Sequence, residues 1–240
     1  MPFFVLGNGS NLLFTDDFHN GIYISTLKLC NISSDGDIIT ADCGARLSSV
    51  CNYAASLSLS GMEELSGIPG TVGGAVYMNA GAYGGEIKDT LIKTVYLTKS
   101  GEVKEIDNEN HLFGYRQSIF QKSGNIILSS SFKLTKGNKN EIKEKMTELL
   151  KRRNEKQPLN YPSAGSTFKR PEGYFAGKLI EDCGLKGYTL GGACVSDKHC
   201  GFVINKDNAS SDDILKLIAH IKETVHKNFG VKLEEEVKVI

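Results

Sequence analysis

The spacing of apolar residues divides the first half of the chain into short strands and one helix. Alternating apolar and polar residues, separated by polar turns such as Ser100-Gly101, predict a mostly antiparallel sheet. From Leu47 to Leu59 apolar residues recur every three or four positions, which predicts a helix that ends at Gly61. The strands are expected at residues 3–6, 22–24, 38–40, 94–98, 103–106 and 126–134.

The second half of the chain is richer in helices. Apolar stripes on otherwise charged segments predict these helices, and short apolar runs predict strands between them. The polar segment 136–140 changes the local composition and is predicted to separate a domain of residues 1–136 from one of residues 140–240. Helices are expected at 141–156, 174–183 and 210–230, and strands at 200–205 and 231–240.

The segment Gly67–Gly85 has the most unusual composition in the chain. It holds seven glycines and one proline in nineteen residues, so its polar capacity lies mainly in backbone N–H and C=O groups, which need partners. Glycine permits close approach to a ligand, and a run of exposed N–H groups forms a concavity suited to phosphate. The composition fits two interpretations equally: a pyrophosphate site, or a glycine-rich turn between two strands.

A second loop of similar character favours the pyrophosphate interpretation. Residues 7–11, Gly-Asn-Gly-Ser-Asn, lie between two apolar strands, and loops at the ends of buried strands often bind ligands. The loop is not a Rossmann fingerprint, because Leu12 stands in place of the third glycine, and it is not a Walker A loop, because no Gly-Lys-Ser/Thr follows. Two such loops predict a dinucleotide bound without a Rossmann fold.

The overall composition restricts the partners and the compartment. Lys plus Arg and Asp plus Glu number 28 each, so no net charge favours nucleic acid or an anionic membrane. No apolar run approaches the roughly 20 residues that span a bilayer, and the first residues lack the features of a signal peptide. We therefore predict a cytoplasmic protein whose partners are small molecules, with no nucleic acid and no membrane. A monomer is expected as well.

The cysteines and histidines do not indicate a metal site. No CxxC spacing occurs among the cysteines, so free and mostly buried thiols are predicted rather than a zinc site or a redox pair. The histidines lack metal-ligand spacing, so no metal is assigned. The six cysteines are Cys30, Cys43, Cys51, Cys183, Cys194 and Cys200.

Two residues outside the glycine-rich loops have surroundings suited to chemistry. Arg116 lies among aromatic and small residues, where a guanidinium suits bidentate binding of a carboxylate or a developing oxyanion; a structural ion pair is the alternative. Ser166 stands in a glycine-containing loop flanked by prolines. No Gly-x-Ser-x-Gly surrounds it, so acyl transfer is disfavoured, and proton donation to carbon competes with a simple turn serine.

Several charged residues near the C-terminal half have both a functional and a structural interpretation. If Val237 and Val239 point to the core, Glu235 joins them and Glu236 lies on the opposite face of the strand. Glu236 then faces solvent or a cleft. The basic segment Lys151–Arg153 either complements the helix dipole as a solvated face or contacts substrate phosphates. His199 either has a structural role or lies near the substrate.

Six ordered blocks of sequence resemble the UDP-N-acetylenolpyruvoylglucosamine reductases, the MurB family. They cover nearly the whole chain: GNGSNLL, GIPGTVGGAVYMNAGAYGGE, FGYRQSIF, PSAGSTFKRP, GLKG with VSDKHCGFVIN, and LEEEV. No tyrosine-bearing insertion is evident between Ser131 and Lys151, so the chain is similar to the shorter, type II branch of the family.

The resemblance implies an α+β fold and a reaction. The fold would be an FAD-binding domain of the vanillyl-alcohol-oxidase (PCMH) type followed by a C-terminal α+β substrate-binding domain. NADPH would reduce FAD, which would pass hydride to UDP-N-acetylglucosamine enolpyruvate and give UDP-N-acetylmuramate for peptidoglycan. Arg116 and Glu236 would stabilise the charge of the enolate carboxylate, and Ser166 would protonate the adjacent carbon.

The ligand-binding residues are expected in the two glycine-rich loops and beside the Ser166 loop. Lys156, Lys169 and Arg170 are candidates for the diphosphate of the UDP substrate. The expected cofactor-binding residues are Gly7, Asn8, Gly9, Ser10, Asn11, Gly67, Ile68, Pro69, Gly70, Thr71, Gly73, Gly74, Asn79, Gly81 and Ala82.

Two alternative functions compete with the reductase. Another flavoprotein oxidase of the same fold would keep both loops but would have no reason to keep Arg116, Ser166 and Glu236 together. A non-catalytic relic or binding module would hold no flavin. In the family a further segment precedes the 7–11 loop, whereas here Met1 lies six residues ahead of Gly7. We therefore expect this chain to hold FAD less tightly than an N-terminally extended one.

Overall fold

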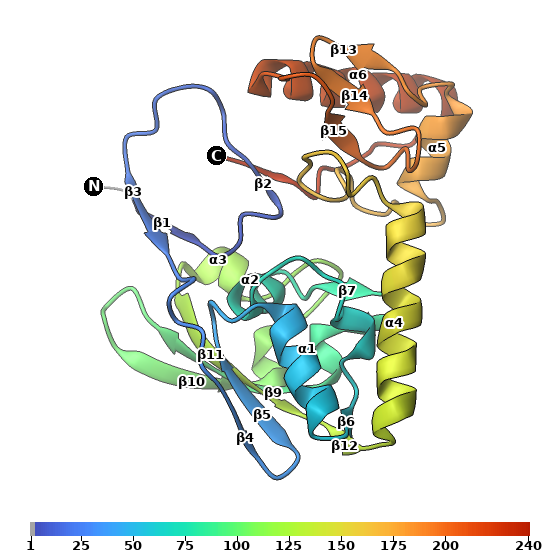
Figure 1. Cartoon of the computed structure of the whole chain (residues 1–240). Helices are drawn as coiled ribbons and strands as arrows, with labels where there is room; N and C mark the ends of the chain where they lie inside the picture. The colour runs from blue at the N-terminus through green and yellow to red at the C-terminus, as the bar shows by residue number, and fades with distance from the viewer. Residues whose placement is uncertain (1–2) are drawn as a thin grey trace. The chain divides into compact units, whose positions relative to one another are not determined.

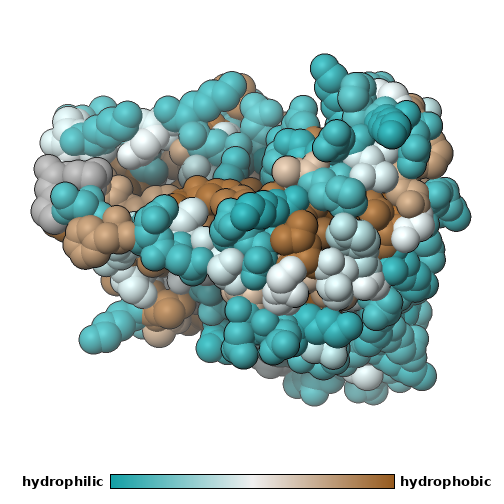
Figure 2. Space-filling view, turned by 90° about the horizontal axis from the view of Figure 1, so that it is seen from above, coloured by the Kyte–Doolittle hydropathy of each residue, from teal (hydrophilic) through white to brown (hydrophobic). Residues whose placement is uncertain are grey.

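The computed structural model describes residues 3–240, which fold into two compact units (Figure 1). The first unit comprises residues 3–8 and 20–153, and the second comprises residues 9–19 and 154–240. Hydrophilic side chains cover most of the face shown in Figure 2, with hydrophobic residues in patches among them. Each unit has its own buried hydrophobic cluster.

A five-stranded antiparallel sheet forms the centre of the first unit. The alternation of apolar and polar residues predicted this sheet, and every pairing within it is antiparallel. Its central strand, β11, pairs with β5 on one side and β9 on the other. In order across the sheet the strands are β10 (Val103–Asp107), β9 (Leu91–Leu97), β11 (Ile126–Lys133), β5 (Ile38–Asp42) and β4 (Ile32–Asp35).

Helices α1 (Leu47–Ser56) and α2 (Val72–Tyr77) pack against this sheet and bury their apolar residues in the core. The predicted helix over 47–59 stops at Ser56, because Ser58 takes a φ of 60° and β6 (Leu59–Ser60) leaves to pair with β12 (Thr135–Lys136). The remaining short elements are η1 (Glu63–Leu65), β7 (Gly81–Ala82), β8 (Gly85–Glu86), η2 (Ile87–Asp89), η3 (Asn108–His111) and α3 (Phe120–Ser123).

The first strand of the chain forms a separate small sheet. β1 (Phe3–Leu6) pairs with β3 (Ile22–Ser25) in parallel, not in the antiparallel arrangement that dominates the unit. A parallel pair needs a long connection, and residues 7–21 supply it. All four residues of β3 are exposed.

The second unit packs its longest helix on a three-stranded antiparallel sheet, and a shorter helix packs against that long helix. Its longest helix, α6, has the predicted serine cap: Ser210 and Asp213 form a capping box, and Gly230 ends the helix with a φ of 71°. The helices are α5 (Ala176–Asp182) and α6 (Ser211–Phe229), and the strands are β13 (Thr189–Leu190), β14 (Ala193–Val195) and β15 (Val203–Asn205).

The predicted strand over 231–240 is mostly irregular. Only β16 (Lys238–Val239) is a strand, and it pairs in parallel with β2 (Leu12–Leu13), while Glu235 forms an isolated bridge with Phe168. Val237 is buried, but Val239 is 45% exposed, so the condition that both valines point to the core holds only for Val237. A two-residue pairing at the edge of the unit leaves the Val239 side chain in solvent.

The compact units divide the chain elsewhere than the predicted domains of residues 1–136 and 140–240. Helix α4 (Lys139–Lys156) belongs to the first unit as far as Arg153, because Ile142 and Met146 are buried in that unit's core. Residues 9–19 belong to the second unit, where β2 pairs with β16. Composition cannot show these long-range pairings, and the assignment of functional domains stays a prediction.

Candidate functional site

A cavity of about 430 Å³ in the first unit lies against the start of the glycine-rich segment. The Asn8 amide donates to the Pro69 carbonyl at 2.9 Å, so the two predicted loops meet through a direct hydrogen bond. Arg46 and Ser48 also line the cavity, and only their place at the start of a helix distinguishes them in the sequence. Five predicted cofactor residues line it: Asn8, Gly67, Ile68, Pro69 and Gly70.

Close packing explains two of the predicted glycines. A Cβ atom at Gly7 would lie 2.3 Å from the Thr71 hydroxyl oxygen, and one at Gly73 would lie 2.9 Å from the Cys43 Cβ. Neither position has room for a side chain. The two loops therefore approach each other and the core at distances that only glycine allows.

The backbone N–H groups of the glycine-rich segment are largely satisfied within the protein. Val72 donates to the Ala45 carbonyl at 2.9 Å, Gly73 donates to Cys43 at 2.8 Å, and Gly70 donates to Ile68 at 2.9 Å. The expected long run of exposed donors is therefore wrong for this part of the segment, because the chain folds back on the segment that precedes α1. Within residues 3–240, the N–H groups of Gly67 and Thr71 have no protein acceptor.

The residues around this cavity fit the anionic part of a dinucleotide. The guanidinium of Arg46 supplies positive charge, the Thr71 hydroxyl caps α2, and the open N–H donors of Gly67 and Thr71 belong to the same segment. Gly9, with a φ of 69°, begins the part of the other loop that belongs to the second unit. There the Asn11 amide donates to the Glu236 carbonyl at 3.0 Å.

Arg116 is held at the tip of a tight turn in the first unit. Its guanidinium donates to the Gly81 carbonyl at 3.1 Å, so it contacts a residue predicted to bind the cofactor. Its backbone φ is 54°, and its carbonyl accepts a bond from the Gln121 amide at 2.9 Å. Asn79 and Tyr83 also have positive φ values, so unusual backbone conformations gather in this part of the unit.

Asn79 holds the Arg116 turn in place with a fully buried side chain. Its amide nitrogen donates to the Gly114 carbonyl at 3.0 Å and to Glu86 at 3.2 Å, and its oxygen accepts from the Lys88 N–H at 3.1 Å. These bonds use both amide hydrogens and the oxygen. The geometry therefore gives the Asn79 side chain a positioning task. Ser118, which donates to the Tyr77 carbonyl at 2.6 Å, acts in the same way and had no sequence signal.

Ser166 and Glu236 belong to the second unit, where their two segments run antiparallel. The Glu236 N–H donates to the Thr167 carbonyl and the Lys169 N–H donates to the Glu234 carbonyl, at 2.9 and 2.8 Å. The Ser166 hydroxyl donates to the Phe168 carbonyl at 3.2 Å. The structure therefore brings Ser166 and Glu236 into neighbouring segments, while Arg116 lies in the first unit.

The neighbouring glutamates are engaged in ion pairs. Glu235 pairs with Lys222 at 2.7 Å, and Glu234 pairs with Lys169 at 3.1 Å. Partial burial alone would raise the pKa of Glu235. The hydrogen bond from Lys222, the backbone hydrogen bond and the positive charge of Lys222 outweigh burial, so the pKa is lowered. Glu235 and Glu234 thus point to different cations, as the alternation along an extended segment requires.

The predicted diphosphate residues differ in how they are engaged. Lys169 already pairs with Glu234, and the Arg170 guanidinium lies 4.0 Å from the centre of the Phe175 ring. Lys156 is exposed at the end of α4. In the same helix Arg152 lies 5.3 Å from the Tyr83 ring centre, and burial lowers the pKa of Arg153. Arg153 is therefore partly buried, whereas Arg152 is exposed and pairs with Glu148 of the same helix at 3.7 Å.

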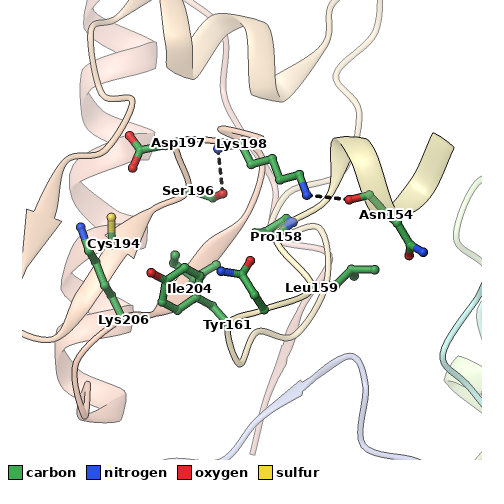
Figure 3. A pocket seen from close by; sticks show the side chains of 11 residues that line it. Asn154, Pro158, Leu159, Tyr161, Cys194, Ser196, Asp197, Lys198, Ile204 and Lys206 are labelled. Atoms are coloured by element: carbon green, nitrogen blue, oxygen red, sulfur yellow. Dashed lines mark hydrogen bonds between the residues drawn. The ribbon is translucent and has the colours of Figure 1, made fainter. Parts of the chain in front are cut away.

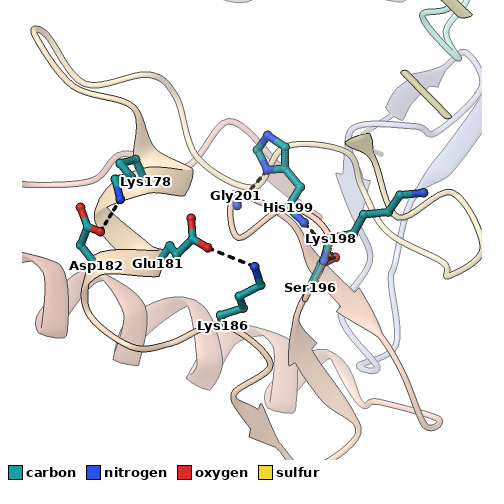
Figure 4. A network of polar contacts seen from close by, with 8 residues as sticks. All are labelled: Lys178, Glu181, Asp182, Lys186, Ser196, Lys198, His199 and Gly201. Atoms are coloured by element: carbon teal, nitrogen blue, oxygen red, sulfur yellow. Dashed lines mark hydrogen bonds and ion pairs between the residues drawn. The ribbon is translucent and has the colours of Figure 1, made fainter. Parts of the chain in front are cut away.

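His199 lies in a polar network of the second unit (Figure 4). Its Nδ1 accepts a hydrogen bond from the Gly201 N–H at 3.1 Å, and burial lowers the pKa of the ring. A Cβ atom at Gly177 would come within 3.2 Å of the ring, so glycine is needed beside it. These contacts support a structural task for His199, and its contact with substrate stays a prediction.

A second cavity, of about 600 Å³, lies on the sheet of the second unit (Figure 3). The Lys198 ammonium donates to the Asn154 carbonyl at the edge of the cavity. The backbone N–H of Lys198 donates to the Ser196 hydroxyl at 3.1 Å. None of the predicted site residues lines this cavity, so no sequence pattern indicated it. Its wall comes from segments 154–161, 194–198 and 204–206.

Two further properties are clear for residues 3–240. No helix among them is long and apolar enough to cross a membrane, and no group of three or more His, Cys, Asp or Glu side chains is arranged to hold a metal ion. The six cysteines are free thiols, and four of them are buried.

The comparisons with known proteins identify the class and then the family. Residues 1–107 match the FAD binding domain family, so the chain is a flavin-dependent oxidoreductase with an FAD-binding domain. Residues 157–240 match the UDP-N-acetylenolpyruvoylglucosamine reductase C-terminal domain. The chain belongs to the UDP-N-acetylenolpyruvoylglucosamine reductase family.

The similarity to individual relatives extends over the whole chain. The UDP-N-acetylenolpyruvoylglucosamine reductase of Agathobacter rectalis is 55% identical over 100% of this chain and 81% of its own length. The UDP-N-acetylenolpyruvoylglucosamine reductase of Caldanaerobacter subterraneus subsp. tengcongensis is 51% identical over 100% of this chain and 80% of its own length. The crystal structure of MurB from Thermus caldophilus superposes with a TM-score of 0.87 at 36% identity, covering 99% of this chain and 85% of that chain. The predicted fold class, α+β with an FAD-binding domain ahead of a family-specific C-terminal domain, is confirmed.

Proposed function

We propose that this chain uses FAD and NADPH to reduce UDP-N-acetylglucosamine enolpyruvate to UDP-N-acetylmuramate for peptidoglycan synthesis. The observation that carries the proposal is the bond between the Arg116 guanidinium and the Gly81 carbonyl, in a member of this reductase family. This bond joins Arg116, the strongest candidate for binding the substrate carboxylate, to the glycine-rich segment expected to bind the flavin. We also infer that the enzyme works as a monomer in the cytoplasm, where NADPH and nucleotide sugars are available.

Arg116 is assigned to the carboxylate of the enolpyruvyl group. Bound FAD would supply the chemistry of hydride transfer between NADPH and the substrate carbon, and Arg116 would act on the charge that results. Hydride addition moves negative charge toward the substrate carboxylate, and a preorganised guanidinium stabilises such charge without further reorganisation. The carbonyl of Gly81 and the strained turn fix the guanidinium before substrate arrives.

Ser166 and Glu236 are assigned to the protonation of the substrate. Ser166 would hold the proton that reaches the carbon next to the hydride acceptor, and Glu236, acting as an acid, would stabilise the enolate. Their segments are fixed to each other by main-chain hydrogen bonds at Thr167 and Glu236. This pairing supports a joint role, because it keeps both side chains on one rigid piece of backbone.

The UDP diphosphate is assigned to Lys156 first, with Lys169 and Arg170 as further candidates. Lys156 is exposed at the end of α4, whereas Lys169 already neutralises Glu234. A lysine in an ion pair supplies less net charge to a new anion than an exposed lysine does. Lys169 would contribute only if the diphosphate competed with Glu234.

A two-step colour test examines the function directly. The purified chain, loaded with FAD, is mixed anaerobically with NADPH, and bleaching of the flavin absorbance is recorded. The enolpyruvyl substrate is then added without oxygen. Return of the colour together with UDP-N-acetylmuramate supports the proposal. Bleaching without recovery indicates another flavoprotein oxidase, and absence of bound flavin indicates a binding module.

A further inference from the structure

His111 is a fully buried histidine at the base of the loop that carries Arg116. Its ring stacks on Phe113 with centroids 4.8 Å apart, and Phe120 meets it edge-on at 5.7 Å. None of the ring is open to solvent, with a relative exposure of 0%. A side chain so enclosed has no direct contact with a ligand, so its task must lie in the fold around it.

The partners of the two ring nitrogens fix the tautomer of His111. Nδ1 lies 2.8 Å from the Asp107 carbonyl oxygen, which only accepts, so Nδ1 carries the hydrogen. Burial lowers the pKa of His111 and keeps the ring neutral, so Nε2 accepts a bond from the Thr94 hydroxyl at 2.9 Å. The Thr94 oxygen is in turn 3.0 Å from the Ser130 hydroxyl, which donates to it.

This chain of hydrogen bonds ties His111 to the middle of the sheet. Thr94 lies on β9 and Ser130 on β11, and the two residues are register partners in the antiparallel pair. Both hydroxyls are buried, at 0% and 1% exposure. A buried polar chain in which every member is bonded rigidifies its surroundings, and one with a missing member is costly.

The loop above His111 is closed at its base and strained at its tip. The Ile119 N–H donates to the His111 carbonyl at 2.7 Å, which closes the loop over residues 112–118. At the tip, Gly114 and Gln117 exchange N–H to carbonyl bonds of 3.1 and 3.2 Å. Arg116 lies inside this turn with its φ of 54°, a conformation that persists only when the surroundings enforce it.

We propose that His111 is a positioning residue for Arg116. The hydrogen-bond chain from Ser130 through Thr94 fixes the base of the loop on the sheet. The fixed base holds the strained turn, and the turn holds the Arg116 guanidinium on the Gly81 carbonyl. The inference rests on the proposed function only for what Arg116 does to substrate, not for how Arg116 is held.

Three substitutions test the chain of hydrogen bonds. Thr94→Val keeps the volume and removes the hydroxyl that reaches His111. His111→Asn retains a polar group near the Nδ1 position and leaves nothing at Nε2, whereas His111→Gln reaches the Nε2 position. Thr98→Val, directly after the end of β9 and with a hydroxyl bonded only among surface residues, is the control.

The first measurement is amide hydrogen exchange of the loop, and the second separates the two half-reactions. Thr94→Val and His111→Asn should speed exchange at Gly114, Gln117 and Ile119 by on the order of tenfold relative to amides of β5, the effect of losing one buried bond. Reoxidation of the flavin by the enolpyruvyl substrate should slow by a similar factor while reduction by NADPH keeps its rate. His111→Gln should recover part of both losses, and Thr98→Val should change neither.

Arg116→Ala, measured in parallel, separates this inference from the proposed function. If Arg116→Ala slows reoxidation but Thr94→Val and His111→Asn change neither exchange nor reoxidation, the positioning role is overturned and the function stands. If Arg116→Ala has no effect on reoxidation, the role given to Arg116 fails, and loop exchange alone then decides the positioning role. Exchange that rises equally in the loop and in β5 would show general destabilisation and would also overturn it.

Discussion

The Arg116 turn and the Ser166 segment are held in place in different ways. Arg116 is clamped by side chains: buried Asn79 grips the turn at Gly114, and the backbone of Arg116 itself is strained. Ser166 lies in a segment held by main-chain bonds to the segment of Glu234–Glu236, with exposed ion pairs around it. A side-chain clamp fails when one buried group is removed, whereas main-chain pairing survives most substitutions. The two regions should therefore respond differently to mutation, in chemistry and in stability.

The largest effect is expected for Ser166→Ala. Because main-chain bonds hold the segment, the substitution should leave the fold intact and remove only the hydroxyl. Reoxidation of the flavin by substrate should slow by roughly 100-fold to 10,000-fold, the usual contribution of a positioned acid, with little change in reduction by NADPH. Stopped-flow absorbance of each half-reaction measures this, with exposed Ser163→Ala as control. Equal slowing of both half-reactions would remove Ser166 from the role.

The next largest effect should separate Glu236 from its neighbours. Glu236→Gln should slow reoxidation on the order of 100-fold, as the loss of one stabilising group does. Glu235→Gln should act mainly on stability, because Glu235 already pairs with Lys222 at 2.7 Å. The same stopped-flow comparison ranks all three glutamates. If Glu234→Gln slowed reoxidation more than Glu236→Gln, the assignment of the acid to Glu236 would be wrong.

A smaller effect, in stability, is expected for Asn79→Ala in the clamped region. It leaves the Lys88 N–H without its acceptor and removes one of the two donors to the Gly114 carbonyl, which keeps only the Gln117 N–H; the loss should cost roughly 1–3 kcal/mol. The free energy of unfolding in urea measures the loss, with the exposed Asn140→Ala as control. A loss no greater than that of the control would contradict the idea that side chains clamp this region.

The clamped region should also give stability a dependence on pH. Burial lowers the pKa of His111, so the unfolded chain binds a proton more readily than the folded one. The free energy of unfolding should therefore fall as pH drops through the unfolded pKa of about 6.5, level off below the folded pKa, and be unaffected by this group above neutrality. Burial lowers the pKa of His199 as well, so the comparison uses His199→Gln as background. If adding His111→Gln to His199→Gln leaves the slope of the free energy of unfolding against acidic pH unchanged, His111 does not contribute.

The smallest effect is expected for the exposed ion pair of Lys169 and Glu234. Lys169→Met should lower the free energy of unfolding by less than about 1 kcal/mol, because solvent screens a surface pair. If Lys169 does not bind the diphosphate, the KM for the UDP substrate should stay near its original value, whereas Lys156→Met should raise it. A larger rise in KM for Lys169→Met would reverse that order.

Local pattern was enough for much of the architecture. Alternation along residues 94–134 predicted the antiparallel strands, and the serine cap and Gly230 predicted the bounds of α6, because these signals depend on neighbours a few positions apart. Ordered motifs over nearly the whole chain were enough for the family, and therefore for FAD and the class of reaction. Both kinds of information are carried by short stretches of sequence.

Only the tertiary structure decided how the candidate site is held. The N–H groups of the glycine-rich segment are mostly used by the segment before α1, and Asn79 uses its whole amide inside the protein. The hydrogen-bond chain from Ser130 to His111 joins residues far apart in sequence, and a single histidine without a motif around it does not indicate such a chain. Donors and acceptors find their partners only when strands are in register and loops are closed, so no local pattern contains that information.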